Sequence, residues 1–216
     1  MPANQPTPKP KRAPQARTAR TRARILTEAR QAIAENGFEA TTTLDIARRA
    51  EVAEGSVFAH FTNKQGLLLA LMQDHYATIT QQVQAIASDT PDPGARLQAL
   101  LLFHLDNLKA SWPELRAYAH YGRYGSAEMT TAFRSLNRHY TQVFMASLQE
   151  LMTNANQPAD WPLEALRDMI FGTAEHWAFR AMELDQDMDP TQAVSFIMSR
   201  LNLPPDPGSD DSTTTP

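Results

Sequence analysis

The side chains best suited to specific chemistry lie between residues 54 and 60, in the segment EGSVFAH. If Val57 anchors this segment as a helix, the outward-facing residues are Glu54, Gly55, Ser56, Phe58, Ala59 and His60. Hydroxyl and imidazole groups reach phosphates or base edges, and the amides at a helix start bind phosphate. A short helix carrying these groups fits the major groove, so the segment predicts contact with duplex DNA.

The flanking residues supply the elements that would hold this helix. Apolar side chains recur at helical spacing through residues 43–64, and they are Ile46, Ala47, Ala50, Val52, Val57 and Phe61. They predict a helix over 44–50 with Thr43 as its N-cap, then a three-residue turn and a second helix over 54–60. This arrangement is typical of a helix-turn-helix motif.

The 216 residues carry a formal net charge of −4, but the charges are unevenly distributed. The first 24 residues contain seven Lys or Arg and no acid. A basic start suits contact with DNA phosphates, and we expect Arg20, Arg22 and Arg24 to contribute. A solvated helix start explains each of these arginines equally well.

Helical periodicity continues through the rest of the chain, without a strand pattern. We predict an all-α protein of about nine helices, near residues 18–36, 44–50, 54–60, 64–89, 93–110, 113–121, 126–154, 162–185 and 190–201.

Residues 20–72 resemble the TetR family of transcriptional regulators. The matching positions are Asn36, Gly37, Phe38, Ala40, Thr41 to Thr43, Asp45, Ile46, Ala47, Ala50, Val52, Gly55 to Phe58, His60, Phe61, Asn63, Lys64, Leu67 and Leu68. The third helix of family members enters the major groove. The resemblance therefore implies base contacts from the part containing Gly55 and Ser56. It also implies backbone contacts from Phe58, His60 and Lys64, and a phosphate contact from Thr43.

Composition at the two ends and the resemblance between them together imply a division of the chain. The expected parts are a disordered basic arm at 1–16, a helix-turn-helix DNA-binding domain at 17–64, a helical effector-binding and dimerisation domain at 65–203, and a disordered acidic tail at 204–216.

Three departures from the family pattern affect the DNA-binding segment. Glu51 stands where glycine is usual, which implies a strained turn at a cost of about 1 kcal/mol. Ala53 replaces a serine or threonine that would cap the third helix. Phe58 replaces the commoner tyrosine and lacks its hydroxyl. We expect weaker DNA affinity per half-site unless the basic arm compensates.

One reading helix covers few base pairs, so such proteins dimerise on near-palindromic operators. In the family, the last two helices form the interface. Their apolar stripe predicts contacts from Ile170, Ala174, Trp177, Ala178, Ala181, Val194, Ile197, Met198 and Leu201. An intrachain core is the alternative explanation of the same stripe.

Residues 93–154 carry more polar-tipped aromatics than a simple core needs, as if lining a pocket for a small, largely apolar effector. The predicted lining is Phe103, His104, Tyr121, Phe133, Asn137, Tyr140 and Phe171. Plain core packing is the alternative. Residues 167–176, RDMIFGTAEH, are similar to a helix of family members that sense acyl-coenzyme A, although close packing at Gly172 also explains them.

Other functional classes find little support. Catalytic motifs such as HExxH and GxSxG are missing, and with no Cys and six scattered His we expect no enzyme activity, metal site or cofactor. The longest apolar run, residues 67–72, is too short to span a membrane, so we expect a cytoplasmic protein. The prediction is a repressor released by its effector, with an architectural or protein-binding helix-turn-helix module as the alternative.

Overall fold

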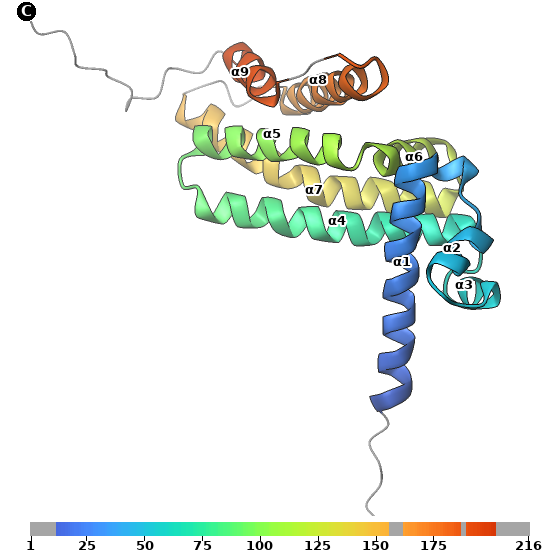
Figure 1. Ribbon diagram of the computed structural model, residues 1–216. Coiled ribbons are helices and arrows are strands. Elements are labelled where there is room, and N and C mark those ends of the chain that lie inside the picture. Colours follow the sequence, from blue (N-terminus) through green and yellow to red (C-terminus); the bar gives the residue numbers. More distant parts are fainter. Residues whose placement is uncertain (1–11, 156–161, 187–188, 202–216) are drawn as a thin grey trace, which may run out of the picture. The chain divides into compact units, whose positions relative to one another are not determined.

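The structure, a computed structural model, describes residues 12–155, 162–186 and 189–201. These residues form nine α-helices and no strand, which confirms the all-α prediction (Figure 1). The helices are α1 (Arg12–Ala40), α2 (Thr43–Arg49), α3 (Glu54–Phe61), α4 (Lys64–Asp89), α5 (Pro93–Ala110), α6 (Trp112–Tyr124), α7 (Ala127–Asn154), α8 (Leu163–Glu183) and α9 (Pro190–Arg200).

The chain divides into two compact units, residues 1–72 and 73–216. The division falls inside α4, whereas the sequence places the domain boundary after residue 64. Because α1 begins at Arg12, residues 12–16 of the predicted arm are helical. The rest of that arm, residues 1–11, and the predicted tail lie outside the described residues.

The first unit is organised around the buried stripe of α1. The apolar side chains that form this stripe are all buried, and they are Ile25, Ala29, Ala32, Ile33 and Phe38. Gly37 interrupts the helical backbone with a φ of 77° at the predicted helix end, yet the helix resumes to Ala40. The Thr41 hydroxyl donates a hydrogen bond to the carbonyl of Gly37 at 2.8 Å and thus stabilises this kink.

Helix α5 is the central element of the second unit. It contacts α6, α7, α8 and α9, and its buried apolar residues are Leu97, Leu100, Leu101, Leu105 and Leu108. The helix begins with Asp92 as N-cap and Pro93 in the first turn, both favourable there. Within the described chain, we find no helix with the length and apolarity that crossing a membrane requires.

Candidate DNA-binding and effector sites

Helix α3 is anchored by one face and exposes the other. Val57 and Phe61 are buried, and α3 packs against α2. Gly55, Phe58 and Ala59 are exposed, with 44% of the Phe58 surface accessible. The remaining predicted contact residues of this helix are half-buried, and they are Glu54, Ser56 and His60. The helix-turn-helix geometry is therefore present, with part of the predicted face open to solvent.

The start of α2 differs by one residue from the sequence prediction. Thr42 is the N-cap, because its hydroxyl accepts a hydrogen bond from the Asp45 backbone N–H at 3.1 Å. Thr43 is the first helical residue, and its hydroxyl donates to Oε1 of Glu54 at 2.7 Å. The prediction of Thr43 as the cap is wrong, because three consecutive threonines offer the same chemistry and only the extended backbone of Thr42 suits a cap.

The turn between α2 and α3 has the two weaknesses expected from its sequence. Glu51 has a φ of 50°, in the left-handed region that favours glycine. Ala53, the N-cap of α3, makes no side-chain hydrogen bond. Arg24 supports the turn from α1, since its Nη2 donates to the Glu51 carbonyl at 3.4 Å.

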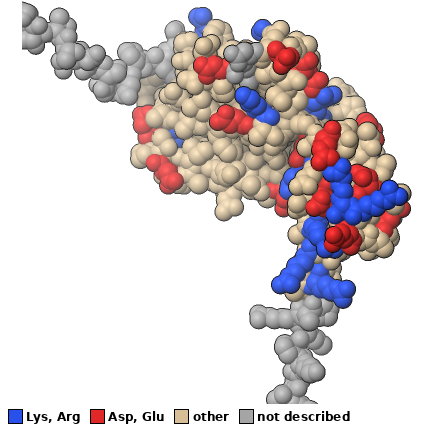
Figure 2. All heavy atoms as spheres, viewed as in Figure 1, with Lys and Arg blue, Asp and Glu red and all other residues tan. Residues whose placement is uncertain are grey.

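Several basic side chains predicted to meet DNA have partners within the chain. Lys64 donates to the carbonyl of Glu39 at 3.0 Å, and its Nζ lies 4.4 Å from the centre of the Phe38 ring. The Arg22 guanidinium lies 5.3 Å from the centre of the Phe61 ring. Figure 2 shows acidic side chains beside basic ones over these helices. Contact with phosphates would therefore exchange existing partners for new ones.

Arg49 joins α1 to α2 and was missed by the sequence reasoning. Its guanidinium lies 2.6 Å from the Glu35 carboxylate and 3.1 Å from that of Asp45. The hydrogen bond with Glu35 raises the pKa of Arg49 and lowers the pKa of Glu35. The four-residue spacing between Asp45 and Arg49 is a readable signal, whereas the pairing with Glu35 depends on the fold.

In the second unit, a buried aromatic cluster surrounds His104 of α5. The imidazole contacts the rings of Tyr140, Phe144 and Phe171, with ring centres 4.9 to 6.0 Å apart. His104 Nδ1 and the Tyr140 hydroxyl lie 2.9 Å apart, while Nε2 has no hydrogen-bond partner among the described residues. Burial lowers the pKa of His104 to about 4, so the imidazole is uncharged at neutral pH.

Tyr76 of α4 connects this cluster to two more of the predicted effector residues. Its hydroxyl donates to Oδ1 of Asn137 at 3.4 Å, and its ring centre lies 6.3 Å from that of Phe133. Tyr76 is not among the residues predicted to line the pocket. Phe103 and Tyr121, also predicted to line the pocket, are half-buried. The structure thus brings together five of the seven predicted residues, in close mutual packing.

Comparison with known proteins connects the helix-turn-helix geometry to a family. Residues 25–71 match the model for bacterial regulatory proteins of the tetR family. The uncharacterised HTH-type transcriptional regulator YvkB of Bacillus subtilis is 47% identical over 55 residues, which are 26% of this chain and 29% of YvkB. The fatty acid metabolism regulator protein of the same organism is 21% identical over 82% of this chain and 91% of its own length. The helix-turn-helix segment of this chain, residues 25–71, is of the tetR family of bacterial regulatory proteins.

The likeness to solved regulators extends to the fold of both units. The transcriptional regulator FadR of Bacillus subtilis, solved in complex with stearoyl-CoA, has a TM-score of 0.70 to this chain at 20% sequence identity. The match covers 83% of this chain and 96% of FadR. At this identity the comparison establishes a shared fold.

Much of the stripe predicted for dimerisation lies inside the second unit. Six of its side chains are at most 3% exposed, namely Ile170, Ala174, Ala178, Val194, Ile197 and Leu201. The intrachain alternative applies to these six, because α5 packs against both α8 and α9. Trp177, Ala181 and Met198 are half-buried. The close packing expected at Gly172 is not found, since nothing lies within 4 Å of a Cβ built there.

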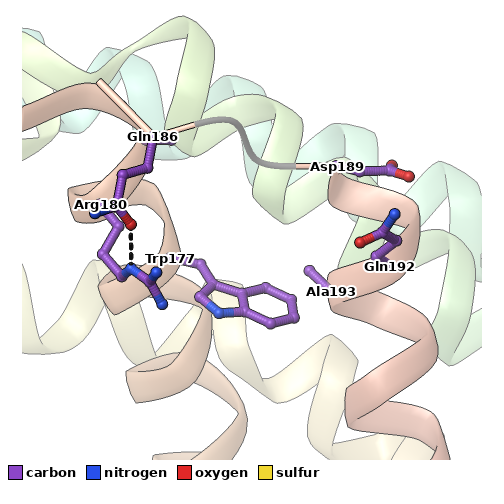
Figure 3. Close-up of a pocket in the computed structure, with 7 residues that line it drawn as sticks. Trp177, Arg180, Gln186, Asp189, Gln192 and Ala193 are labelled. Atoms are coloured by element: carbon purple, nitrogen blue, oxygen red, sulfur yellow. Dashed lines mark hydrogen bonds between the residues drawn. The ribbon is translucent and has the colours of Figure 1, made fainter. Parts of the chain in front are cut away.

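A pocket of about 180 Å³ lies between α8 and α9 (Figure 3). Its lining is Trp177, Arg180, Ala181, Gln186, Asp189, Gln192 and Ala193. Figure 3 shows the Trp177 indole lying between the two helices, while Nε of Arg180 donates to Oε1 of Gln186 at 2.7 Å. The lining includes none of the predicted effector residues, so this pocket is distinct from the aromatic cluster.

Proposed function

We propose that this TetR-family regulator binds a near-palindromic operator as a homodimer and is released by a small, largely apolar effector. The observation that carries the proposal is the anchored helix α3, which exposes Gly55, Phe58 and Ala59 within the segment that matches the family. An outward-facing helix of this kind enters the major groove with its N-terminal residues on the base edges. The protein would act as a cytoplasmic repressor.

The proposed DNA contacts divide into two kinds. Gly55, Ser56 and Ala59 lie in the base-reading part of α3. Contacts to the DNA backbone are assigned to Arg20, Arg22, Arg24, Thr43, Phe58, His60 and Lys64. Arg22, Arg24 and Lys64 already have partners within the chain. Each of them would give up that interaction to contact a phosphate, so the contact adds less binding free energy.

The second copy is proposed to pack on the apolar side chains that α8 and α9 leave exposed. These are Met169, Phe179, Met182 and Phe196, with Leu184 directly after α8, and each is at least 41% exposed. Large exposed apolar side chains on neighbouring helices favour a protein interface. The half-buried Trp177, Ala181 and Met198 would complete it.

The effector is proposed to be an acyl-CoA whose acyl chain enters the aromatic cluster of the second unit. Two observations support this class: the fatty acid metabolism regulator that resembles the chain over most of its length, and the FadR fold solved with stearoyl-CoA. Because His104, Tyr140 and Phe171 are closely packed, entry of the chain would separate α8 from α5 and α7. Release would follow if the effector binds better to the conformation with low DNA affinity.

Operator binding is testable with the full chain and the DNA upstream of its own gene. At ~0.15 M salt, fluorescence anisotropy should show at least about tenfold tighter binding to one upstream duplex than to a random duplex of equal length. Equal affinity for both duplexes would contradict operator recognition and favour the architectural alternative. That alternative draws support from the acidic Glu51 and Glu54 in the DNA-binding segment.

Release by the effector needs a separate measurement. Palmitoyl-CoA added to the operator complex should lower its anisotropy to that of free DNA, whereas coenzyme A without an acyl chain should not. Retention of the complex at saturating palmitoyl-CoA would reject the acyl-CoA class and leave the operator assignment unaffected.

A further inference from the structure

Glu54, the first residue of α3, is held across the helix-turn-helix by Thr43, the first residue of α2. The Thr43 hydroxyl donates to Oε1 of Glu54 at 2.7 Å, and both residues are half-buried. Helices α2 and α3 pack against each other (Figure 1). This carboxylate is therefore anchored at the end of α3 that reads bases in a helix-turn-helix.

The anchoring restricts the carboxylate without neutralising it. A hydroxyl supplies one hydrogen, which is directed at Oε1, and an ionised carboxylate has about four acceptor sites on its two oxygens. A glutamate fixed by a neighbouring helix also loses less side-chain entropy when it contacts a ligand. Glu54 thus offers a pre-positioned acceptor that carries a negative charge.

Such a group selects among the base edges of the major groove. Guanine and thymine present acceptor oxygens, which repel a carboxylate, and adenine places its acceptor N7 beside the N6 amine. Cytosine presents the N4 amine, a donor without an acceptor beside it on the same base. We propose that Glu54 reads a cytosine N4 amine in each half-site, and that Thr43 is its positioning residue. The inference rests on the proposed insertion of α3 into the major groove.

The negative charge of Glu54 should also weaken binding to random DNA. A carboxylate near the phosphate backbone is repelled wherever its base contact is missing, and that repulsion is offset only where the cytosine amine is present. Removing the charge should therefore strengthen binding to random duplex and weaken the preference for the operator. A residue that only supports the fold would not produce this opposite pair of effects.

The test is selection of binding sites from a randomised duplex pool by the full-length chain, followed by sequencing. The wild type should enrich a symmetric motif in which one position per half-site favours cytosine by about fivefold or more. Glu54→Gln should abolish that preference or move it to adenine, which a glutamine amide can pair with. The other motif positions should stay unchanged, and affinity for random duplex should rise. Thr43→Val should weaken the cytosine preference, and the loss of its proposed phosphate contact should lower affinity for all duplexes without changing the preferences at the other motif positions.

Glu51→Gln is the matched control. It removes the same charge from the neighbouring turn, where the Glu51 carboxylate is exposed and lies 4.0 Å from Nη1 of Arg24, whereas the Thr43 hydroxyl donates to Glu54. The control should keep the cytosine preference. Melting curves of all variants establish that they fold.

Three outcomes decide the matter. A wild-type motif that Glu54→Gln leaves unchanged, or weakens equally at every position, overturns the role of Glu54 while operator recognition stands. The same loss in Glu51→Gln reduces the effect to net charge and also overturns it. Failure of the wild type to enrich any motif overturns the proposed function and this inference with it.

Discussion

His104 shows at the scale of one residue how an apolar environment changes the chemistry of a side chain. The sequence leaves two explanations open, a pocket residue or a satisfied polar group of the core. The structure has features of both, since Nδ1 is paired with Tyr140 while Nε2 has no partner among the described residues. Periodicity places a histidine on a buried face, but the position of its partner 36 residues away depends on the fold.

The low pKa of His104 predicts a pH dependence of stability. The folded-state pKa of about 4 lies below the ordinary value of 6.5, so the unfolded chain binds the proton more tightly. The contribution of His104 is complete above pH 6.5 and is lost as pH falls toward 4. Between about pH 7 and 5, the wild type should lose about 2 kcal/mol of unfolding free energy more than His104→Gln, which does not titrate.

Urea denaturation of both proteins at several pH values measures this difference. Carboxylates common to the two chains titrate alike and largely cancel in the comparison. Parallel stability curves for wild type and variant would show that His104 is protonated normally in the folded state.

At the scale of elements, some features of the helix ends follow from neighbouring residues in the sequence, whereas others depend on how the helices pack. The sequence predicts the start of α3 at Glu54, the uncapped Ala53 and the unfavourable turn at Glu51, because each depends on neighbouring residues alone. It misplaces the cap of α2, because Thr42 and Thr43 are chemically equal there. The pairing of Thr43 with Glu54 spans eleven positions and depends on how two helices pack.

The two caps predict opposite changes in stability. Ala53→Ser supplies the missing side-chain acceptor at the start of α3 and should raise the unfolding free energy by about 1 kcal/mol. Thr42→Ala removes the existing cap of α2 and should lower it by a similar amount. Urea unfolding at neutral pH compares both variants with the wild type. A null effect of Ala53→Ser would mean that water already satisfies the first amides of α3.

Helix α6 approaches α7 so closely that one glycine is required. A Cβ built on Gly122 would lie 2.3 Å from Cγ of Phe133, one of the predicted effector residues. Gly122→Ala should therefore destabilise the chain by roughly 1–3 kcal/mol, although alanine is the better helix former. Gly55→Ala is the control, because nothing lies within 4 Å of the added methyl group. Equal melting temperatures for Gly122→Ala and the wild type would mean that Phe133 moves aside freely.

At the scale of the whole molecule, the interface of the proposed dimer could not be predicted from the sequence. Periodicity identifies an apolar face on each of the last two helices but does not say which surface covers it. Six residues of that stripe are buried within this chain, where α5 packs against α8 and α9, and the apolar side chains left exposed lie at other positions. Fold class and the helix-turn-helix follow from local patterns, whereas the interface depends on contacts between distant segments.

Replacing exposed apolar side chains on these helices should separate the copies. Phe179→Asp combined with Phe196→Asp, at positions 42% and 47% exposed, should yield a monomer in sedimentation analysis with intact melting behaviour. Its operator affinity should fall at least about a hundredfold, because a single half-site then carries the binding. Tyr124→Asp, at the 78% exposed end of α6, should remain dimeric. A dimer that survives the double change would place the interface elsewhere.

The continuity of α4 across the division between Met72 and Gln73 has a geometric consequence. Each residue of an α-helix turns the chain by about 100° and advances it by about 1.5 Å. One residue inserted after Met72 would therefore turn each later residue of α4 by about 100° around the helix axis. A substitution along α4 changes packing at one position, whereas a change in its length changes the face on which every later residue of the helix lies. We therefore expect relatives of this chain to differ in residue identity along α4 while the length of the helix is kept.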